Sequence, residues 1–206
     1  MSDNVHFYQP KEGHQLPHDP FNAIIAPRPI GWISTKSATG QANLAPYSFF
    51  NAFNYHPPII GFSSIGYKDT VKNAQETGAF CWSLVTHSLA ERMNQTSAAV
   101  EAEIDEFELA GITKGQSKII DVPFVADSPV VMECKTSQVI QLQAANGENC
   151  GSWLVLGEVV GVHIAKHALK QGIYDTAAME PVLRGGGAGD YFSVSDSQKF
   201  QLFRPK

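Results

Sequence analysis

A short polar stretch, residues 63–70, combines the groups that commonly hold a phosphate in proteins. Ser63 and Ser64 end a predicted strand, and Lys68, Asp69 and Thr70 lie where a helix is expected to begin. The first turn of a helix offers unpaired N–H groups and a partial positive charge, which favour an anion. Two interpretations follow: a phosphate-binding site, or a capped helix with an exposed lysine. The stretch matches neither a Walker A loop nor a dinucleotide-binding fingerprint.

A second stretch interleaves small or polar residues with aromatic ones. It runs through Asn43, Leu44, Ala45, Pro46, Tyr47, Ser48, Phe49, Phe50 and Asn51. Pro46 has no N–H, so it removes one donor from a sheet ladder. Such a segment can present backbone N–H and C=O groups to a flat heterocycle. The alternative is a core strand with a bulge.

Two further stretches are candidates for ligand binding: one is stiffened by prolines, and the other is rich in glycine. Arg28 lies between two prolines, and Ser34 and Thr35 follow it on the same predicted strand, where they can donate hydrogen bonds. Residues 181–191 contain a run of glycines, which permits close approach of a ligand to the backbone or simple flexibility. For the stretch with Arg28, the alternative is an edge strand with an ordinary surface arginine. For residues 181–191, the alternative is a flexible tail that reaches a neighbouring subunit.

Other chemistries find little support in the sequence. It contains no Gly-x-Ser-x-Gly elbow, no His-Glu-x-x-His motif and no compact cluster of Asp, Glu and His. Cys81, Cys134 and Cys150 are odd in number and widely spaced, which argues against a disulfide framework and a structural zinc site. His14 and His18 lack the helical context that would aim them at one ion. We therefore expect no metal site.

Composition narrows the class of protein further. The 206 residues are 43% hydrophobic and 17% charged, which is typical of a globular domain. The formal net charge of −5 gives no electrostatic support for nucleic-acid binding. Residues 1–4 lack the basic and apolar regions of a secretory signal, and no apolar run approaches the ~18 residues of a membrane helix. A cytoplasmic enzyme or carrier without nucleic-acid or membrane partners is expected.

Six segments have the composition of β-strands, with partial period-two alternation in the longer ones. They are residues 24–34, 43–53, 58–64, 79–85, 129–142 and 152–165. Six antiparallel strands with a few intervening helices predict a small, mainly β barrel with helices on its outside. The strands do not alternate regularly with long helices, which argues against a Rossmann fold. Residues 1–22 are expected to form an extended arm, 23–192 a single domain and 193–206 a tail.

Four short helices are predicted from cap signals. Residues 69–77 form the first, with Asp69 or Thr70 as its cap and Gly78 at its end. The second opens with the capping box of residues 88–91 and runs toward Gln95. The others are residues 105–110, stopped by Gly111, and 166–171, stopped by Gly172.

Taken in order, these stretches resemble the flavin reductase-like, FMN-binding split-barrel family, which includes flavoredoxins and the reductase components of two-component monooxygenases. The resemblance spans roughly residues 20–191. It is carried by residues 26–30, 34–35, 40, 43–50, 57–58, 62–63, 68–70, 73, 77–80, 132–134, 157–159 and 181–186. One departure is the pair Trp82 and Ser83, where relatives often have a more aliphatic or Asn-containing pair.

The resemblance implies a six-stranded antiparallel Greek-key split β-barrel with a few flanking helices, and a homodimer with FMN near the subunit interface. It places the isoalloxazine against residues 43–48 and the phosphate near Ser63, Ser64, Lys68 and Thr70. The implied cofactor-binding residues are Ser34, Thr35, Asn43, Leu44, Ala45, Pro46, Tyr47, Ser48, Ser63, Ser64, Lys68, Asp69 and Thr70.

The implied activity is reduction of flavin by NADH or NADPH, as in the reductase component of a two-component monooxygenase with a partner oxygenase. Hydride transfer needs no side-chain acid or base, so no catalytic residue is expected. Three alternatives stay open: a flavoredoxin-like electron carrier without its own NAD(P)H activity, a ferric-chelate reductase, and a split barrel that has lost its cofactor and serves as an interaction module. A single phosphate cradle favours FMN over FAD.

Overall fold

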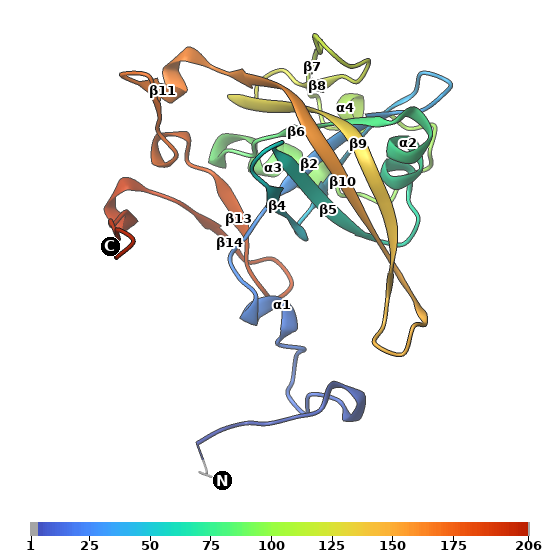
Figure 1. Cartoon of the computed structure of the whole chain (residues 1–206), viewed down its shortest axis with the longest axis vertical. Coiled ribbons are helices and arrows are strands. Elements are labelled where there is room, and N and C mark those ends of the chain that lie inside the picture. The colour runs from blue at the N-terminus through green and yellow to red at the C-terminus, as the bar shows by residue number, and fades with distance from the viewer. Residues whose placement is uncertain (1–3, 206) are drawn as a thin grey trace.

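The computed structural model describes residues 4–205 and is built around one curled antiparallel sheet (Figure 1). Over that range the sheet has seven strands in the order β3-β2-β6-β9-β10-β5-β4. They are β2 (Gly31–Lys36), β3 (Ala42–Tyr47), β4 (Phe50–Asn54), β5 (Ile59–Ile65), β6 (Ala79–Ser83), β9 (Val130–Gln143) and β10 (Asn149–Ile164). The predicted mainly β split barrel is confirmed, with seven strands in the sheet instead of six.

The additional strand comes from residues 43–53, which we predicted as one strand. The chain leaves β3 after Tyr47, passes Ser48 and Phe49, and continues as β4, which pairs with β5. Because β3 and β4 are the two edges of the sheet, this short link joins one edge to the other. Pro46 lies on the edge strand β3, where a missing N–H is tolerated.

The predicted strand 24–34 is also divided. Its start belongs to the helix α1 (Phe21–Ile24), and β1 (Arg28–Pro29) pairs with β13 (Val182–Arg184) outside the main sheet. Only from Gly31 does the chain enter the main sheet, because proline residues cannot donate to a central ladder. The smaller strands are β14 (Tyr191–Ser193) beside β13, β7 (Lys114–Gly115) with β8 (Phe124–Val125), and β11 (Leu169–Lys170) with β12 (Ile173–Tyr174).

The helix α2 (Asp69–Thr77) matches the predicted range, and Gly78 ends it with φ 71°. Its cap differs from the prediction. The N-cap is Lys68, whose backbone is extended, and no side chain hydrogen-bonds to the start of the helix. Asp69 and Thr70 already lie inside the first turn, so neither can cap it.

The remaining helices are shorter than predicted. The hydroxyls of Thr86 and Ser88 bond to each other, so the predicted capping box does not form. Asp105 caps α4 (Glu106–Leu109), the third of the predicted helices, by accepting the N–H of Phe107 (2.9 Å). Residues 166–171 are a 3₁₀ turn followed by β11, not one helix. The ranges are α3 (Ala90–Gln95), α4 (Glu106–Leu109), and the 3₁₀ turns η1 (Pro10–Glu12), η2 (His87–Leu89), η3 (Lys166–Ala168), η4 (Ala177–Met179) and η5 (Asp196–Gln198).

Two apolar clusters lie on opposite faces of β2, because alternate residues of a strand point to opposite sides. Ile33 packs with Phe62 and the residues of α2 on one face. Trp32 packs with Met93 of α3 and Phe107 of α4 on the other. Full burial of each large side chain stabilises the fold by about 1.5–3 kcal/mol. This packing holds α2 and α4 on either side of the neighbouring edge strand β3.

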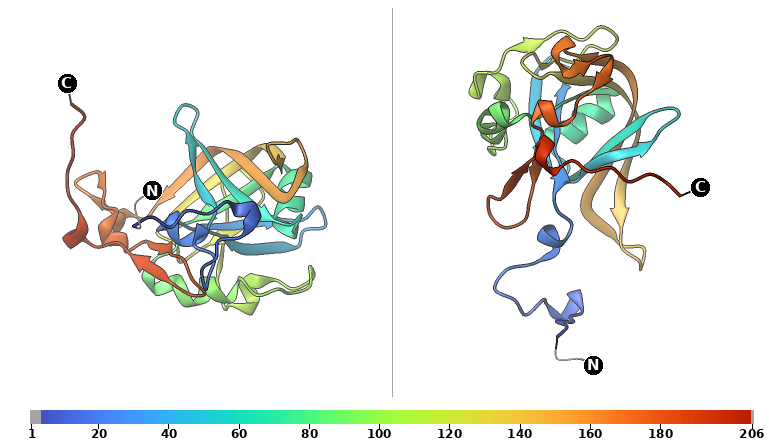
Figure 2. Two further views of the ribbon diagram at one scale, coloured as in Figure 1. Left: turned by 90° about the horizontal axis from the view of Figure 1, so that it is seen from below. Right: turned by 90° about the vertical axis from the view of Figure 1, so that its left-hand side faces the viewer.

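Both ends of the chain extend away from the barrel (Figure 2). Residues 4–27 contain no buried side chain, and Phe200, Leu202 and Phe203 are 79%, 86% and 84% exposed. The boundaries of the arm and the tail stay predictions, and residues 1–3 and 206 lie outside the described range. No helix between residues 4 and 205 is long and apolar enough to cross a membrane.

Candidate functional site

A cavity of about 420 Å³ lies between β3, the start of α2 and the segment that follows α3. We call it the β3–α2 cavity. Its volume is within the range of small-molecule sites. Seven of the residues that line it are predicted cofactor-binding residues: Asn43, Ala45, Pro46, Tyr47, Lys68, Asp69 and Thr70. The other lining residues are Tyr67, Thr96, Ser97, Ala98, Ala99, Val100 and Glu106.

The start of α2 forms the positive end of this cavity. The first N–H groups of a helix have no acceptor within it, and those of α2 receive no side-chain cap. The aligned peptide dipoles add a partial positive charge there, beside the Lys68 ammonium. Asn43 fixes the Thr70 hydroxyl, because its side-chain amide donates to it (Nδ2 to Oγ1, 2.9 Å). These groups form a cradle suited to a small anion.

Glu106 of α4 contributes a carboxyl group to the same cavity. The residue is only 8% exposed, and its Oε2 accepts the N–H of Leu44 (3.0 Å). That bond satisfies a donor of the edge strand β3 that does not pair with β2. Burial raises the pKa of Glu106, and the hydrogen bond from Leu44 opposes this rise.

A second cavity, of about 490 Å³, begins where the first one ends along the chain. Tyr47 lines the β3–α2 cavity, whereas its neighbour Ser48 lines this one, together with Ser63. We call it the β1–β4 cavity. Its lining is Ile24, Ile25, Ala26, Pro27, Arg28, Pro29, Ser48, Phe49, Phe50, Asn51, Phe53, Ser63 and Leu154. Nine of the predicted site residues therefore divide between these two cavities.

The Arg28 side chain ties two backbone segments together at the β1–β4 cavity. Its Nη2 donates to the carbonyl of Gly185 (2.9 Å), and its Nη1 donates to the carbonyls of Asn22 and Ile25. Burial lowers the pKa of Arg28, and the nearby charge of Arg184 lowers it further. Arg28 is 8% exposed, so it is not the surface arginine of the alternative interpretation.

Four predicted site residues reach neither cavity, because their side chains are fully buried within the fold. The Ser34 hydroxyl donates to a carbonyl (2.6 Å), and Thr35 accepts the side-chain amide of Asn73 on α2 (3.2 Å). Alternation along β5 turns Ser64 to the opposite face from Ser63. The four residues are Ser34, Thr35, Leu44 and Ser64, each with 0% exposure.

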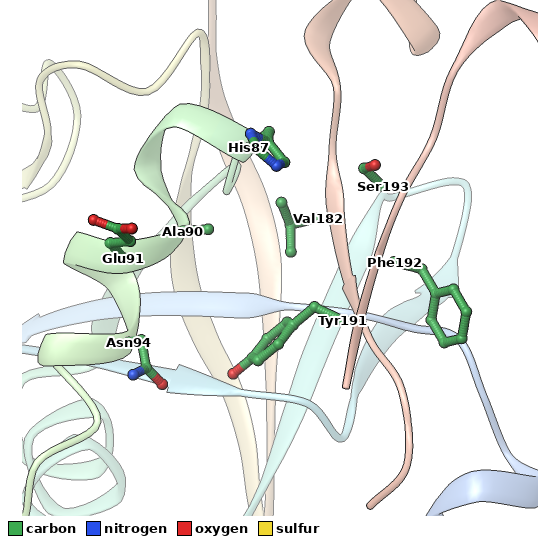
Figure 3. A pocket seen from close by; sticks show the side chains of 8 residues that line it. All are labelled: His87, Ala90, Glu91, Asn94, Val182, Tyr191, Phe192 and Ser193. Atoms are coloured by element: carbon green, nitrogen blue, oxygen red, sulfur yellow. The ribbon is translucent and has the colours of Figure 1, made fainter. Parts of the chain in front are cut away.

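The glycine-rich segment after β13 is a hairpin loop organised by Arg184. Its guanidinium donates to the carbonyls of Gly186 (3.1 Å) and Asp190 (2.7 Å) and lies 4.9 Å from the ring centre of Tyr191. Tyr191 then lines a third cavity of about 310 Å³ between η2–α3 and β13–β14 (Figure 3). His87 and Glu91 are among its lining residues on the helical side, and none of the predicted site residues lines it.

The sequence-based prediction missed the wall of the β3–α2 cavity that faces α2. That wall consists of residues 96–100 and Glu106. Ser97, Ala98 and Ala99 carry no chemical signal in the sequence. Glu106 resembles any acidic residue in a first helical turn, and only the tertiary packing of α4 against β3 brings it to the site.

The curled sheet and its helices define a split-barrel protein. The family described as flavin reductase like domain matches residues 25–182, and the chain belongs to this family. The family is one of flavin oxidoreductases. The resemblance inferred from the ordered motifs is therefore confirmed.

Individual relatives extend over nearly the whole chain. An uncharacterized protein of Halalkalibacterium halodurans is 36% identical over 187 residues, which cover 88% of this chain and 87% of that protein. The crystal structure of nitrilotriacetate monooxygenase component B from Bacillus cereus is 30% identical with a TM-score of 0.86, covering 98% of this chain and 100% of that one. That of 2-nitrobenzoate 2-nitroreductase NbaA from Pseudomonas fluorescens is 28% identical with a TM-score of 0.78, covering 90% and 88%.

Proposed function

We propose that this chain binds FMN and reduces it with NADH or NADPH. The observation that carries the proposal is the uncapped start of α2, with Lys68 and Thr70, inside the β3–α2 cavity. This cradle is a single anion site, which matches the one phosphate of FMN. The names of two similar proteins, a monooxygenase component B and a nitroreductase, are consistent with a reductase.

The residues that line the β3–α2 cavity have the chemical groups needed to bind the phosphate and the ring system of FMN. Lys68, the Thr70 hydroxyl and the N–H groups of the first turn of α2 would hold the phosphate. Ala45 and Pro46 offer an apolar wall for a flat ring system, since neither presents a polar side chain. Ser48 and Ser63 would then be reached only if the ligand extends toward the β1–β4 cavity.

The protein contributes to catalysis by binding the flavin and orienting it toward the nicotinamide. The flavin, when bound, supplies the hydride-accepting chemistry. Fixing it at the α2 cradle and along β3 lowers the entropic barrier to a productive encounter with the nicotinamide. The residues that line the β3–α2 cavity include no histidine or cysteine, and hydride transfer requires neither.

The proposal includes a cytoplasmic homodimer and, as a candidate acceptor of the reduced flavin, a partner oxygenase. Large apolar side chains exposed on the arm and on the tail support a second copy as their cover, among them Phe7 at 77% and Leu202 at 86% exposure. Sedimentation equilibrium of the full chain tests the assembly. Twice the mass of one chain is expected, and the mass of one chain would contradict the dimer.

Anaerobic stopped-flow mixing of the FMN-loaded protein with NADH and with NADPH tests the activity. We expect the visible flavin absorbance to bleach with at least one nucleotide. Bound FMN that neither nucleotide reduces would contradict the reductase and favour an electron carrier. Addition of a ferric chelate to the reduced protein then distinguishes a chelate reductase. Failure to bind FMN would contradict the whole proposal.

A further inference from the structure

Glu106 places a buried carboxyl group in the wall of the cavity that is proposed to take a phosphate. Its Oε2 is engaged by Leu44, and its residue exposure is 8%. Within residues 4–205 no lysine, arginine or histidine nitrogen lies within 4 Å of its carboxylate. A buried carboxylate without a cation is costly, and such groups are usually neutralised by a proton instead.

The charged and titratable groups around Glu106 come from three elements. Asp105 precedes it on α4, and the Asp105 carboxylate is already engaged by Lys114 and by the N–H of Phe107. Asp69 and Lys68 face the cavity from α2, and Tyr47 faces it from β3. Burial raises the pKa of Glu106, and the charges of Asp105 and Asp69 raise it further. The single positive charge of Lys68 cannot neutralise the Glu106 and Asp69 carboxylates together with a bound phosphate.

We propose that Glu106 couples the binding of a phosphorylated flavin to the uptake of one proton, which the carboxyl group takes from solvent at Oε1. This inference rests on the proposed function, because it assumes that the phosphate enters the β3–α2 cavity. A phosphate carries about −1.5 to −2 charge near pH 7, so it favours the neutral form of a carboxyl group nearby. Once protonated, Glu106 changes from an acceptor into a group that also donates a hydrogen bond.

The sign of the pH dependence follows from this coupling. The bound phosphate raises the pKa of Glu106 above its value in the free protein. The contribution of Glu106 to FMN affinity is therefore largest at low pH, and it falls as pH rises from the free-state pKa to the bound-state pKa. In that window the dissociation constant rises by up to about tenfold per pH unit through this one group. Riboflavin has no phosphate, so its affinity is expected to lack this dependence.

The substitution Glu106→Gln isolates the effect. Glutamine keeps an oxygen that can accept the N–H of Leu44 and cannot ionise. The matched control is Glu108→Gln, on the same helix but outside the lining of the cavity, with a side chain 80% exposed. Dissociation constants for FMN and riboflavin are measured by fluorescence titration of the full chain at a series of pH values. Thermal melts establish that each variant is folded.

We expect the FMN dissociation constant to rise more steeply with pH in the wild type and in Glu108→Gln than in Glu106→Gln, with parallel riboflavin curves in all three. Identical FMN curves for the wild type and Glu106→Gln would overturn the inference and leave the proposed function standing. Absence of FMN binding at every pH would instead overturn the proposed function.

A calorimetric measurement on the wild type keeps the test independent of the variant. Titrations in two buffers with different ionisation enthalpies count the protons taken up on binding. They are done inside the pH window in which the FMN dissociation constant of the wild type rises, and as far above the second phosphate pKa of about 6 as that window allows, so that FMN itself takes up little proton. Greater uptake with FMN than with riboflavin is expected, and equal uptake would overturn the inference.

Discussion

Replacing Lys68 with alanine removes the one lysine ammonium that, among residues 4–205, lines the β3–α2 cavity. The change leaves the fold intact because Lys68 is exposed, forms no ion pair with any residue from 4 to 205, and caps α2 through its backbone and not its side chain. The first-turn N–H groups and the Thr70 hydroxyl stay in place. The variant therefore tests how much a single positive charge contributes to phosphate binding.

The expected loss of FMN affinity in Lys68→Ala follows from the solvent exposure of the Lys68 side chain. A hydrogen bond to a charged group contributes about 1.5–3 kcal/mol. Solvent screening of an exposed lysine places the value at the low end of that range. A loss of about 1.5 kcal/mol corresponds to an affinity about tenfold weaker for FMN. Riboflavin lacks the phosphate, so its affinity is expected to change by much less than this.

Quenching of flavin fluorescence on binding provides the assay, with FMN and riboflavin titrated side by side. Lys72→Ala is the matched control, because Lys72 is an exposed lysine one turn further along α2 and outside the cavity lining. Added salt is expected to narrow the difference between the wild type and Lys68→Ala for FMN. Equal losses for the two flavins, or equal losses in the two lysine variants, would refute the phosphate cradle.

Two further predictions concern stability. Burial alone would raise the pKa of Glu133, but hydrogen bonds from the N–H groups of residues 118–120 and from His163 hold it at about 2. This pKa lies below that of the unfolded chain, so the ionised group stabilises the fold at neutral pH. That contribution, about 3 kcal/mol, is lost as pH falls from about 5 toward 2. Urea unfolding of Glu133→Gln should show a correspondingly weaker acid dependence, and an unchanged slope would contradict this. Gly157→Ala places a Cβ 2.4 Å from the Phe80 ring and should cost about 1–3 kcal/mol, whereas Gly189→Ala, with no atom within 4 Å, should melt like the wild type.

The fold was largely predictable because its strands carry strong local signals. Long apolar segments and the helix at residues 69–77 emerged close to their observed bounds. The break between β3 and β4 did not, since residues 43–53 are rich in strand-forming residues throughout and only tertiary pairing sends them to opposite edges of the sheet. Pro46 indicated a missing ladder donor but gave no sign of where that strand ends.

The site was predictable only in part, because burial is a property of the whole fold. Lys68 and Thr70 lie where a helix start places them, and the structure brings them beside Asn43. Ser34 and Thr35 have the right chemistry, yet both side chains are fully buried and hydrogen-bonded within the fold. Glu106 has no distinguishing local signal, because its role depends on the contact of α4 with β3.

A crystal structure of the complex with FMN tests the central claim most directly. The account predicts phosphate density at the first turn of α2, within hydrogen-bond distance of the Thr70 hydroxyl and the Lys68 ammonium. Density for the phosphate in the β1–β4 cavity or in the cavity beside Tyr191, with α2 unliganded, would contradict it.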